Sequence, residues 1–182
     1  MADRMQREAL LRSHVRDVED FPSPGVLFKD ITPLLADADA FRTAVDLLVD
    51  VHDAGRVDKV AGIEARGFLL GAPAAYHLQA GFVPVRKKGK LPGRTSEVAY
   101  DLEYGTAVLE VVHDAFRPGE RVLVVDDVLA TGGTAAAAVD LVLAGGAEPI
   151  GVHVLVEIAG LGGREALARR HPEIPVTTLL GY

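Results

Sequence analysis

One stretch of the sequence, residues 122–134, constrains the fold more than any other. It reads Val-Leu-Val-Val-Asp-Asp-Val-Leu-Ala-Thr-Gly-Gly-Thr, so four apolar residues lead into two adjacent carboxylates and then into a small, glycine-containing turn. A short apolar run of this kind is typical of a buried strand, and the turn after it favours the start of a helix. The stretch therefore predicts a strand–turn–helix unit with a polar corner.

The polar corner has the groups that a sugar phosphate needs. In residues 131–134, backbone N–H groups and hydroxyls can point at a phosphate, with the positive end of the helix dipole behind them. Asp126 and Asp127 would repel a phosphate unless something neutral or cationic lay between, and ribose hydroxyls or a bound Mg²⁺ meet that condition. The two acids and the turn together predict a site for a ribose 5-phosphate.

Two other phosphate motifs are excluded by residue type. A Walker A loop needs Gly-Lys-Ser/Thr before its helix, and no lysine follows Arg121. A dinucleotide fingerprint needs three spaced glycines, whereas Gly132 and Gly133 are adjacent. The remaining alternative is an ordinary strand-to-helix turn that happens to contain Gly-Gly, although turn chemistry alone does not require the Asp-Asp pair.

Composition and charge narrow the class of protein. The chain has 182 residues, enough for one domain with its own core, and its formal net charge of -7 argues against nucleic acid or a membrane surface as the main partner. It has no cysteine, which excludes disulfides and zinc-thiolate sites, and its histidines show no metal-ligand spacing. No apolar run approaches the roughly 20 residues of a membrane span, so a cytoplasmic location is the default expectation.

Periodicity predicts strands that alternate with helices along the chain. Such alternation indicates parallel βαβ units, and hence an α/β fold whose mostly parallel sheet is flanked by helices. Residues 100–112 alternate around a turn and predict an inserted β-hairpin. No linker or repeat is visible, so residues 1–182 are predicted to form a single domain. The predicted helices are 3–16, 39–54, 68–79 and 134–143, and the predicted strands are 57–63, 82–86, 121–125 and 150–157.

Two further loops carry charges where ligands bind in such sheets. Residues 62–67 follow a predicted strand, and their amides together with Arg66 could hold an anion, although an ordinary loop has equal weight. Residues 86–94 hold five cations in an otherwise acidic chain. Because this segment starts at a strand end and contains glycines and a proline, residues 87–104 are predicted to form a flexible lid and hairpin, with a plain exposed loop as the alternative.

Taken together, these stretches give the chain a resemblance to the type I phosphoribosyltransferases, and within them to the adenine phosphoribosyltransferase family, over nearly its whole length. Residues 122–134 are similar to the phosphoribosyl-pyrophosphate motif of the superfamily. The narrower resemblance rests on residues 24–33, 62–68, 86–93 and 102–105. Lys29 stands where Arg is also common and Glu64 where Asp is also common, and a lysine cannot reproduce a bidentate Arg contact.

The resemblance implies the transfer of 5-phosphoribose from phosphoribosyl pyrophosphate to adenine, giving AMP and pyrophosphate. It also implies a homodimer, and Mg²⁺ bound mainly through phosphoribosyl pyrophosphate rather than by a metal site of the protein. Residues 1–35 would form an N-terminal helix and a base-binding segment.

The same resemblance assigns roles to individual residues. The 5-phosphate and ribose would be held by Asp126, Asp127, Ala130, Thr131, Gly132, Gly133 and Thr134. Pyrophosphate would be held by Glu64, Ala65, Arg66, Arg86, Lys87 and Lys90. Adenine would contact Val26, Leu27, Phe28, Lys29 and Leu161. The catalytic residues would be Glu103, as the acid–base group, and Arg66.

Two alternatives stay open at this point. A 6-oxopurine phosphoribosyltransferase would share the phosphate motif but build its base pocket differently. A regulator that binds phosphoribosyl pyrophosphate without turning it over would usually carry a DNA-binding module, for which the first 20 residues are too short and the net charge has the wrong sign.

Overall fold

The computed structural model of the protein describes residues 2–50, 56–101 and 105–182. It divides into two compact units, residues 1–47 and residues 48–182. The prediction of a single domain over the whole chain stays a prediction. Among the described residues, no helix is both long and apolar enough to cross a lipid bilayer.

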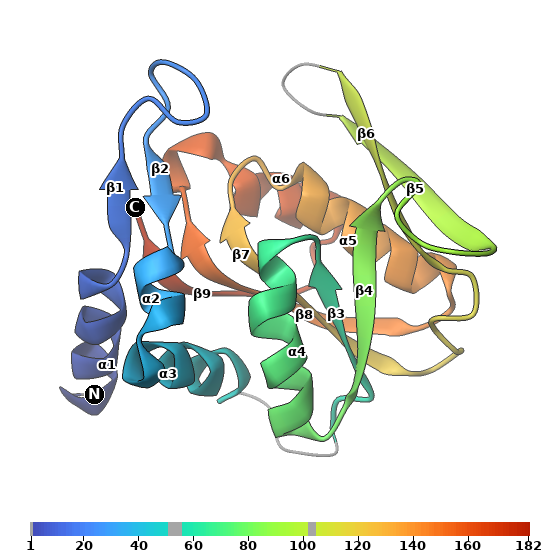
Figure 1. Cartoon of the computed structure of the whole chain (residues 1–182). Helices are drawn as coiled ribbons and strands as arrows, with labels where there is room; N and C mark the ends of the chain where they lie inside the picture. The colour runs from blue at the N-terminus through green and yellow to red at the C-terminus, as the bar shows by residue number, and fades with distance from the viewer. Residues whose placement is uncertain (1, 51–55, 102–104) are drawn as a thin grey trace. The chain divides into compact units, whose positions relative to one another are not determined.

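The first unit holds a short antiparallel ribbon between helices (Figure 1). Helix α1 (Ala2–Ser13) precedes strands β1 (Arg16–Val18) and β2 (Phe28–Asp30), and α2 (Thr32–Ala36) follows. Helix α3 (Ala38–Val49) begins in this unit. The ribbon was not among the elements predicted from the sequence. Two ion pairs link its strands: Arg16 Nη2 lies 2.6 Å from Asp30 Oδ2, and Lys29 Nζ lies 2.6 Å from Asp17 Oδ1.

The second unit is built on a seven-stranded sheet with the order β5-β6-β4-β3-β7-β8-β9. Five strands run parallel, and β5 and β6 form an antiparallel hairpin at one edge. The parallel strands are β3 (Lys59–Ile63), β4 (Gly81–Lys87), β7 (Arg121–Leu129), β8 (Glu148–Glu157) and β9 (Val176–Gly181); the hairpin strands are β5 (Thr95–Asp101) and β6 (Thr106–Val112).

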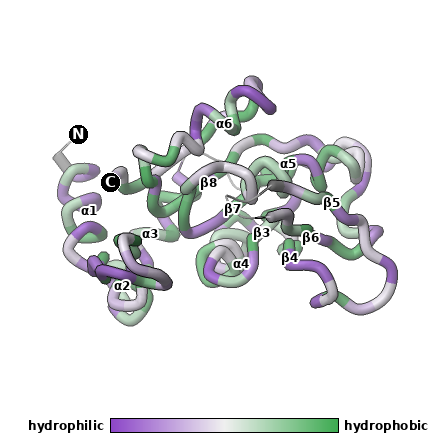
Figure 2. The backbone as a smooth tube through the Cα atoms, turned by 90° about the horizontal axis from the view of Figure 1, so that it is seen from above, coloured by the Kyte–Doolittle hydropathy of each residue, from purple (hydrophilic) through white to green (hydrophobic). Residues whose placement is uncertain are grey.

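Helices cover both faces of this sheet (Figure 2). Helix α4 (Arg66–Leu78) lies on one face, and α5 (Gly133–Ala144) and α6 (Gly163–Arg170) lie on the other. A strand buried on both faces needs apolar residues at every position, and residues 122–125 of β7 are accordingly fully buried. The predicted α/β class, with a mostly parallel sheet flanked by helices and an inserted hairpin, is confirmed.

Three differences from the predicted elements bear on the site. Strand β7 does not end before the two carboxylates but continues through them to Leu129, since it pairs with β8 along this length. Strand β5 begins at Thr95, so the connection after β4 is shorter than the expected lid. Helix α6 and strand β9 were not predicted, and a short 3₁₀ turn, η1 (Ala159–Leu161), leads from β8 into α6.

Candidate functional site

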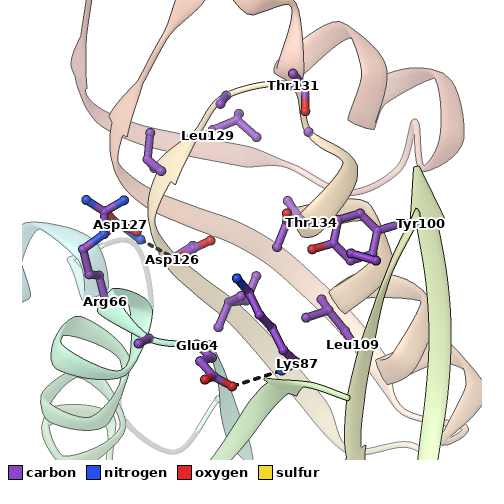
Figure 3. Close-up of a pocket in the computed structure, with 17 residues that line it drawn as sticks. Glu64, Arg66, Lys87, Tyr100, Leu109, Asp126, Asp127, Leu129, Thr131 and Thr134 are labelled. Atoms are coloured by element: carbon purple, nitrogen blue, oxygen red, sulfur yellow. Dashed lines mark hydrogen bonds and ion pairs between the residues drawn. The ribbon is translucent and has the colours of Figure 1, made fainter. Parts of the chain in front are cut away.

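A pocket of about 360 Å³ lies in the second unit, at the carboxyl ends of β3, β4 and β7 (Figure 3). Parallel α/β sheets bind ligands at this edge. The pocket brings together residues that the sequence had assigned to both the phosphoribose and the pyrophosphate. These are Glu64, Ala65, Arg66, Lys87, Asp126, Asp127, Ala130, Thr131, Gly132 and Thr134.

The carboxylate pair is buried at the floor of the pocket. Asp126 and Asp127 are 8% and 5% exposed, and the Asp127 backbone N–H donates to Asp126 Oδ1 at 2.9 Å. Arg66, at the start of α4, places its Nε 3.0 Å from Asp127 Oδ2. Burial and the neighbouring Asp127 charge raise the pKa of Asp126 well above its usual range. Burial also raises the pKa of Asp127, against the opposing effect of Arg66.

A glycine lets helix α4 begin next to this pair. A Cβ built on Gly67 would lie 2.8 Å from Asp126 Oδ1 and 2.9 Å from the Val125 carbonyl oxygen. Real Cβ atoms do not come that close, so any other residue at position 67 would push the first turn of α4 away from β7. Gly67 therefore allows Arg66 to reach Asp127.

The turn after β7 joins the strand to α5 and has the geometry of an anion site. Gly132 adopts φ +85°, a left-handed conformation that glycine takes without steric cost, and α5 begins at the next residue. The first N–H groups of a helix have no partner within the helix, so they can face a ligand. Thr131 and Thr134 line the pocket on either side of this helix start (Figure 3).

The first turn of α6 packs against residues 130–134, the predicted phosphate turn. A Cβ on Gly163 would lie 2.2 Å from the Ala130 carbonyl oxygen and 3.0 Å from the Gly132 nitrogen, and a Cβ on Gly132 would lie 2.5 Å from the Gly163 carbonyl oxygen. Two glycines that meet backbone to backbone thus fix the shape of the turn. The sequence reading missed Gly163, although the Gly162-Gly163 pair before a helix was the available signal.

Glu64 organises the opposite side of the pocket. Its Oε2 accepts hydrogen bonds from Arg86 Nε at 3.1 Å and from the Lys87 backbone N–H at 3.0 Å. Burial alone would raise its pKa, but these bonds hold the pKa of Glu64 below its usual value. The peptide bond between Glu64 and Ala65 is cis. Lys87, the last residue of β4, points its side chain into the pocket (Figure 3).

The hairpin supplies an apolar wall that the sequence reading had not assigned. Tyr100 of β5 and Ala107 and Leu109 of β6 line the pocket. Tyr100 and Ala107 are paired across the two strands, so their side chains share one face. The alternation of residues along the hairpin was the signal that could have identified this wall.

Several predicted site residues lie outside the pocket lining. Arg86 pairs with Glu64, and Lys90 follows in the connection after β4. Leu161 ends η1 and is exposed. Residues 26–29 belong to the first unit, where the rings of Phe21 and Phe28 meet edge to face at 5.0 Å. Gly133 is the first residue of α5 and is likewise absent from the pocket lining, and Glu103 falls outside the described residues.

Comparisons with known proteins show the family of the chain. A family model described as the phosphoribosyl transferase domain matches residues 34–177. The chain belongs to this family. Among curated members, the adenine phosphoribosyltransferase of Acidothermus cellulolyticus is 63% identical over 87% of this chain and 89% of its own length. That of Methylobacterium nodulans is 52% identical over 94% of each chain.

Solved structures of family members share the whole fold. The adenine phosphoribosyltransferase of Rhodothermus marinus matches with a TM-score of 0.92 and 48% identity, covering 98% of this chain and 99% of that one. The Saccharomyces cerevisiae adenine phosphoribosyltransferase, in complex with an imino-altritol bisphosphate and adenine, matches with a TM-score of 0.86 and 35% identity over 97% and 99% of the two chains.

Proposed function

We propose that the protein transfers 5-phosphoribose from phosphoribosyl pyrophosphate to adenine, releasing AMP and pyrophosphate. The observation that carries this proposal is the convergence of three features on one pocket: the glycine turn after β7, the buried carboxylate pair and the cations of the loops after β3 and β4. The high identity to adenine phosphoribosyltransferases over most of the chain supports adenine as the base.

The phosphoribose end of the substrate would bind along β7. The turn 130–134 would receive the 5-phosphate through the exposed N–H groups at the start of α5 and the hydroxyls of Thr131 and Thr134. Asp126 and Asp127 would accept hydrogen bonds from the two ribose hydroxyls. Burial raises the pKa values of both carboxylates, and hydrogen bonds from the ribose would favour their ionised form.

The pyrophosphate would bind across the loops after β3 and β4. Attack of adenine N9 on C1 of the ribose forms the N9–C1 bond, while the C1–O bond breaks and its electron pair leaves with pyrophosphate. Positive charge then develops on the ribose and negative charge on the leaving oxygen. Arg66 and Lys87, which already line the pocket, would stabilise that leaving group together with the amides around Glu64 and Ala65, and Arg86 and Lys90 are proposed to join them.

The pocket is compatible with Mg²⁺ that arrives on the substrate. Among the described residues, no group of three or more metal-ligating side chains converges, whereas Asp126 and Asp127 offer the oxygen donors that Mg²⁺ prefers. When bound through diphosphate and ribose oxygens, the ion would neutralise charge on the leaving group.

Adenine would be recognised by residues 26–29 and Leu161. Phe28 and the edge-packed Phe21 present an aromatic surface on which a purine can stack. A backbone carbonyl that accepts from the 6-amino group and an N–H that donates to N1 would match adenine only, because hypoxanthine and guanine reverse both polarities. Each buried group left unpaired costs about 1–3 kcal/mol, which is enough to decide the substrate.

The base preference can be measured directly. Turnover of phosphoribosyl pyrophosphate with adenine, hypoxanthine, guanine and xanthine should be compared under identical conditions. We expect efficient turnover of adenine alone. Preferred turnover of hypoxanthine or guanine would instead assign a 6-oxopurine enzyme, and binding of phosphoribosyl pyrophosphate without turnover of any base would assign a regulator.

Glu103 is proposed as the group that takes the proton from the purine as N9 attacks. Removing a positioned proton-transfer group costs about 10²–10⁴-fold in rate, so Glu103→Gln should slow single turnover by that order while leaving both binding constants near those of wild type. A structural role would instead lower thermal stability with near-normal turnover. In that case leaving-group stabilisation by Arg66 and the loop cations would carry the catalysis.

The functional form is proposed to be a homodimer in the cytoplasm. An exposed apolar stripe on α4 supports a self-association surface, because Leu69, Ala72 and Tyr76 recur at helical spacing and Tyr76 is 89% exposed. Sedimentation at micromolar concentration should give twice the monomer mass, and Tyr76→Glu should shift it toward the monomer. A fully active wild-type monomer would contradict the proposal.

A further inference from the structure

Glu110 is a buried carboxylate that no step of the proposed reaction uses. It lies in the middle of β6 and is 2% exposed. A buried charge needs compensating hydrogen bonds, and its partners are the backbone N–H groups of the connection that carries the cations. The N–H groups of Lys90 and Leu91 both donate to Glu110 Oε1, at 2.8 and 2.9 Å.

These bonds keep Glu110 ionised. Burial alone would raise its pKa, but hydrogen bonds from the amides of Leu91, Lys90 and Gly89 and from the Thr95 hydroxyl hold the pKa of Glu110 below its usual value. The carboxylate is therefore a fixed negative charge at neutral pH. It is bonded to the connection between β4 and β5, which carries Lys88, Lys90 and Arg94, and like charges of this kind repel one another.

The turn at residues 89–91 is connected to the pocket through Arg86. Arg86 is opposite Glu110 in the strand register, and its Nη1 donates to the Lys90 carbonyl oxygen at 3.0 Å while its Nε reaches Glu64 at 3.1 Å. Glu64 in turn accepts the Lys87 backbone N–H. A continuous set of hydrogen bonds thus leads from Glu110 through the turn to the pocket residues Glu64 and Lys87.

We propose that Glu110 is a positioning residue for pyrophosphate: by holding residues 89–91 it fixes Arg86 and Glu64, and through them it keeps Lys87 in place for the leaving group. This inference rests on the proposed pyrophosphate site. It modifies the expectation of a freely mobile lid, because residues 89–91 would be anchored before ligand binds and only the rest of the connection would move.

The test compares three variants in pyrophosphate binding by calorimetry. Glu110→Gln keeps the shape of the side chain and removes its charge. We expect this variant to bind pyrophosphate about 10-fold more weakly, the order of affinity that one charge-assisted hydrogen bond contributes. Glu97→Gln is the matched control. Glu97 is opposite Glu110 on β5, and its carboxylate lies 2.6 Å from Lys88 Nζ. The Glu97→Gln substitution therefore removes a negative charge close to Glu110 but breaks no hydrogen bond to the backbone of residues 89–91. Glu97→Gln should bind pyrophosphate as wild type does.

Lys87→Ala distinguishes failure of the inference from failure of the site. If Lys87→Ala loses affinity and Glu110→Gln does not, Glu110 positions nothing and the inference is wrong. If Lys87→Ala also binds pyrophosphate like wild type, the proposed pyrophosphate site is wrong and the inference fails with it. Equal losses of pyrophosphate affinity in Glu110→Gln and Glu97→Gln would mean that the net charge of the region, and not positioning by Glu110, determines binding. That result would overturn the proposal.

Hydrogen exchange gives a readout that is independent of activity. The amides of residues 90 and 91 should be protected in the ligand-free wild type and in Glu97→Gln, and they should exchange faster in Glu110→Gln. Should Glu110→Gln fail to fold, Thr95→Val removes another partner of the same carboxylate and should give the same two effects more weakly. Rapid exchange at residues 90 and 91 in ligand-free wild type would overturn the proposal.

Discussion

Asp126 and Asp127 are adjacent and buried, and Arg66 forms an ion pair with Asp127. Their pKa values are both raised, and burial is the largest cause in each case. Two buried carboxylates of this kind cost folding free energy, which a structure without function would avoid. We therefore propose that the pair binds ligand and that its cost would be offset by hydrogen bonds from ribose hydroxyls.

A prediction at this scale is that Asp126→Asn stabilises the empty protein and impairs its function. A carboxyl whose pKa is raised on folding keeps its proton longer in the folded state, so above that pKa its ionisation destabilises the protein. Asn removes this cost and still accepts the Asp127 N–H. At pH 7 we expect a rise in Tm of roughly 2–4 °C, the shift that about 1 kcal/mol produces at this size.

The pH dependence provides the control for Asp126→Asn. The gain in Tm should shrink as the pH falls toward 3.8, the ordinary carboxyl value, and should vanish below it, where Asp126 is protonated in both the folded and the unfolded state of wild type. The Asp126→Asn variant should also bind phosphoribosyl pyrophosphate more weakly than wild type does. A variant that is less stable than wild type at pH 7, with unaltered ligand affinity, would show that Asp126 is a structural residue.

At the scale of elements, the phosphate turn takes its shape from a helix that the sequence reading did not predict. The strand, the turn and α5 follow from local signals: the apolar run, the adjacent glycines and the helical periodicity after them. The contact with Gly163 joins residues about thirty positions apart, and no local pattern announces it. The same holds for Glu110, whose role depends on strand register rather than on its neighbours in sequence.

Predictability within the site follows the same division. Motif residues such as Thr131 and Arg66 could be named because their chemistry is encoded in a short segment. The extension of β7 through Asp126 and Asp127 could not, because it depends on pairing with β8, which overrides the polar character of the two residues. Tyr100 and Leu109 needed the hairpin's register, which fixes which face of each strand meets the pocket.

Gly163→Ala tests the contact between α6 and the phosphate turn. Its methyl group would lie 2.2 Å from the Ala130 carbonyl oxygen, so the turn must shift, and we expect KM for phosphoribosyl pyrophosphate to rise by about 10-fold or more. Gly160→Ala is a matched control three residues away, since its Cβ would meet nothing within 4 Å. Equal kinetics in the two variants would mean that the turn does not depend on α6.

On the scale of the whole molecule, the second unit holds the pocket proposed to bind phosphoribosyl pyrophosphate, and residues 26–29 of the first unit are a proposed adenine segment. Substitutions in the pocket should weaken the binding of phosphoribosyl pyrophosphate, whereas substitutions at Phe28 should mainly change the KM for adenine.

We propose that the pocket at the carboxyl ends of β3, β4 and β7 binds phosphoribosyl pyrophosphate. It is tested most directly by calorimetric titration of that ligand, with Mg²⁺, into wild type, Asp127→Asn and Thr131→Ala, with Thr177→Ala on β9 as a matched control outside the pocket. We predict that the two pocket variants bind about 10-fold or more weakly, each having lost a hydrogen bond to a charged or buried partner, and that Thr177→Ala binds like wild type. Unchanged affinity in both pocket variants would contradict the account.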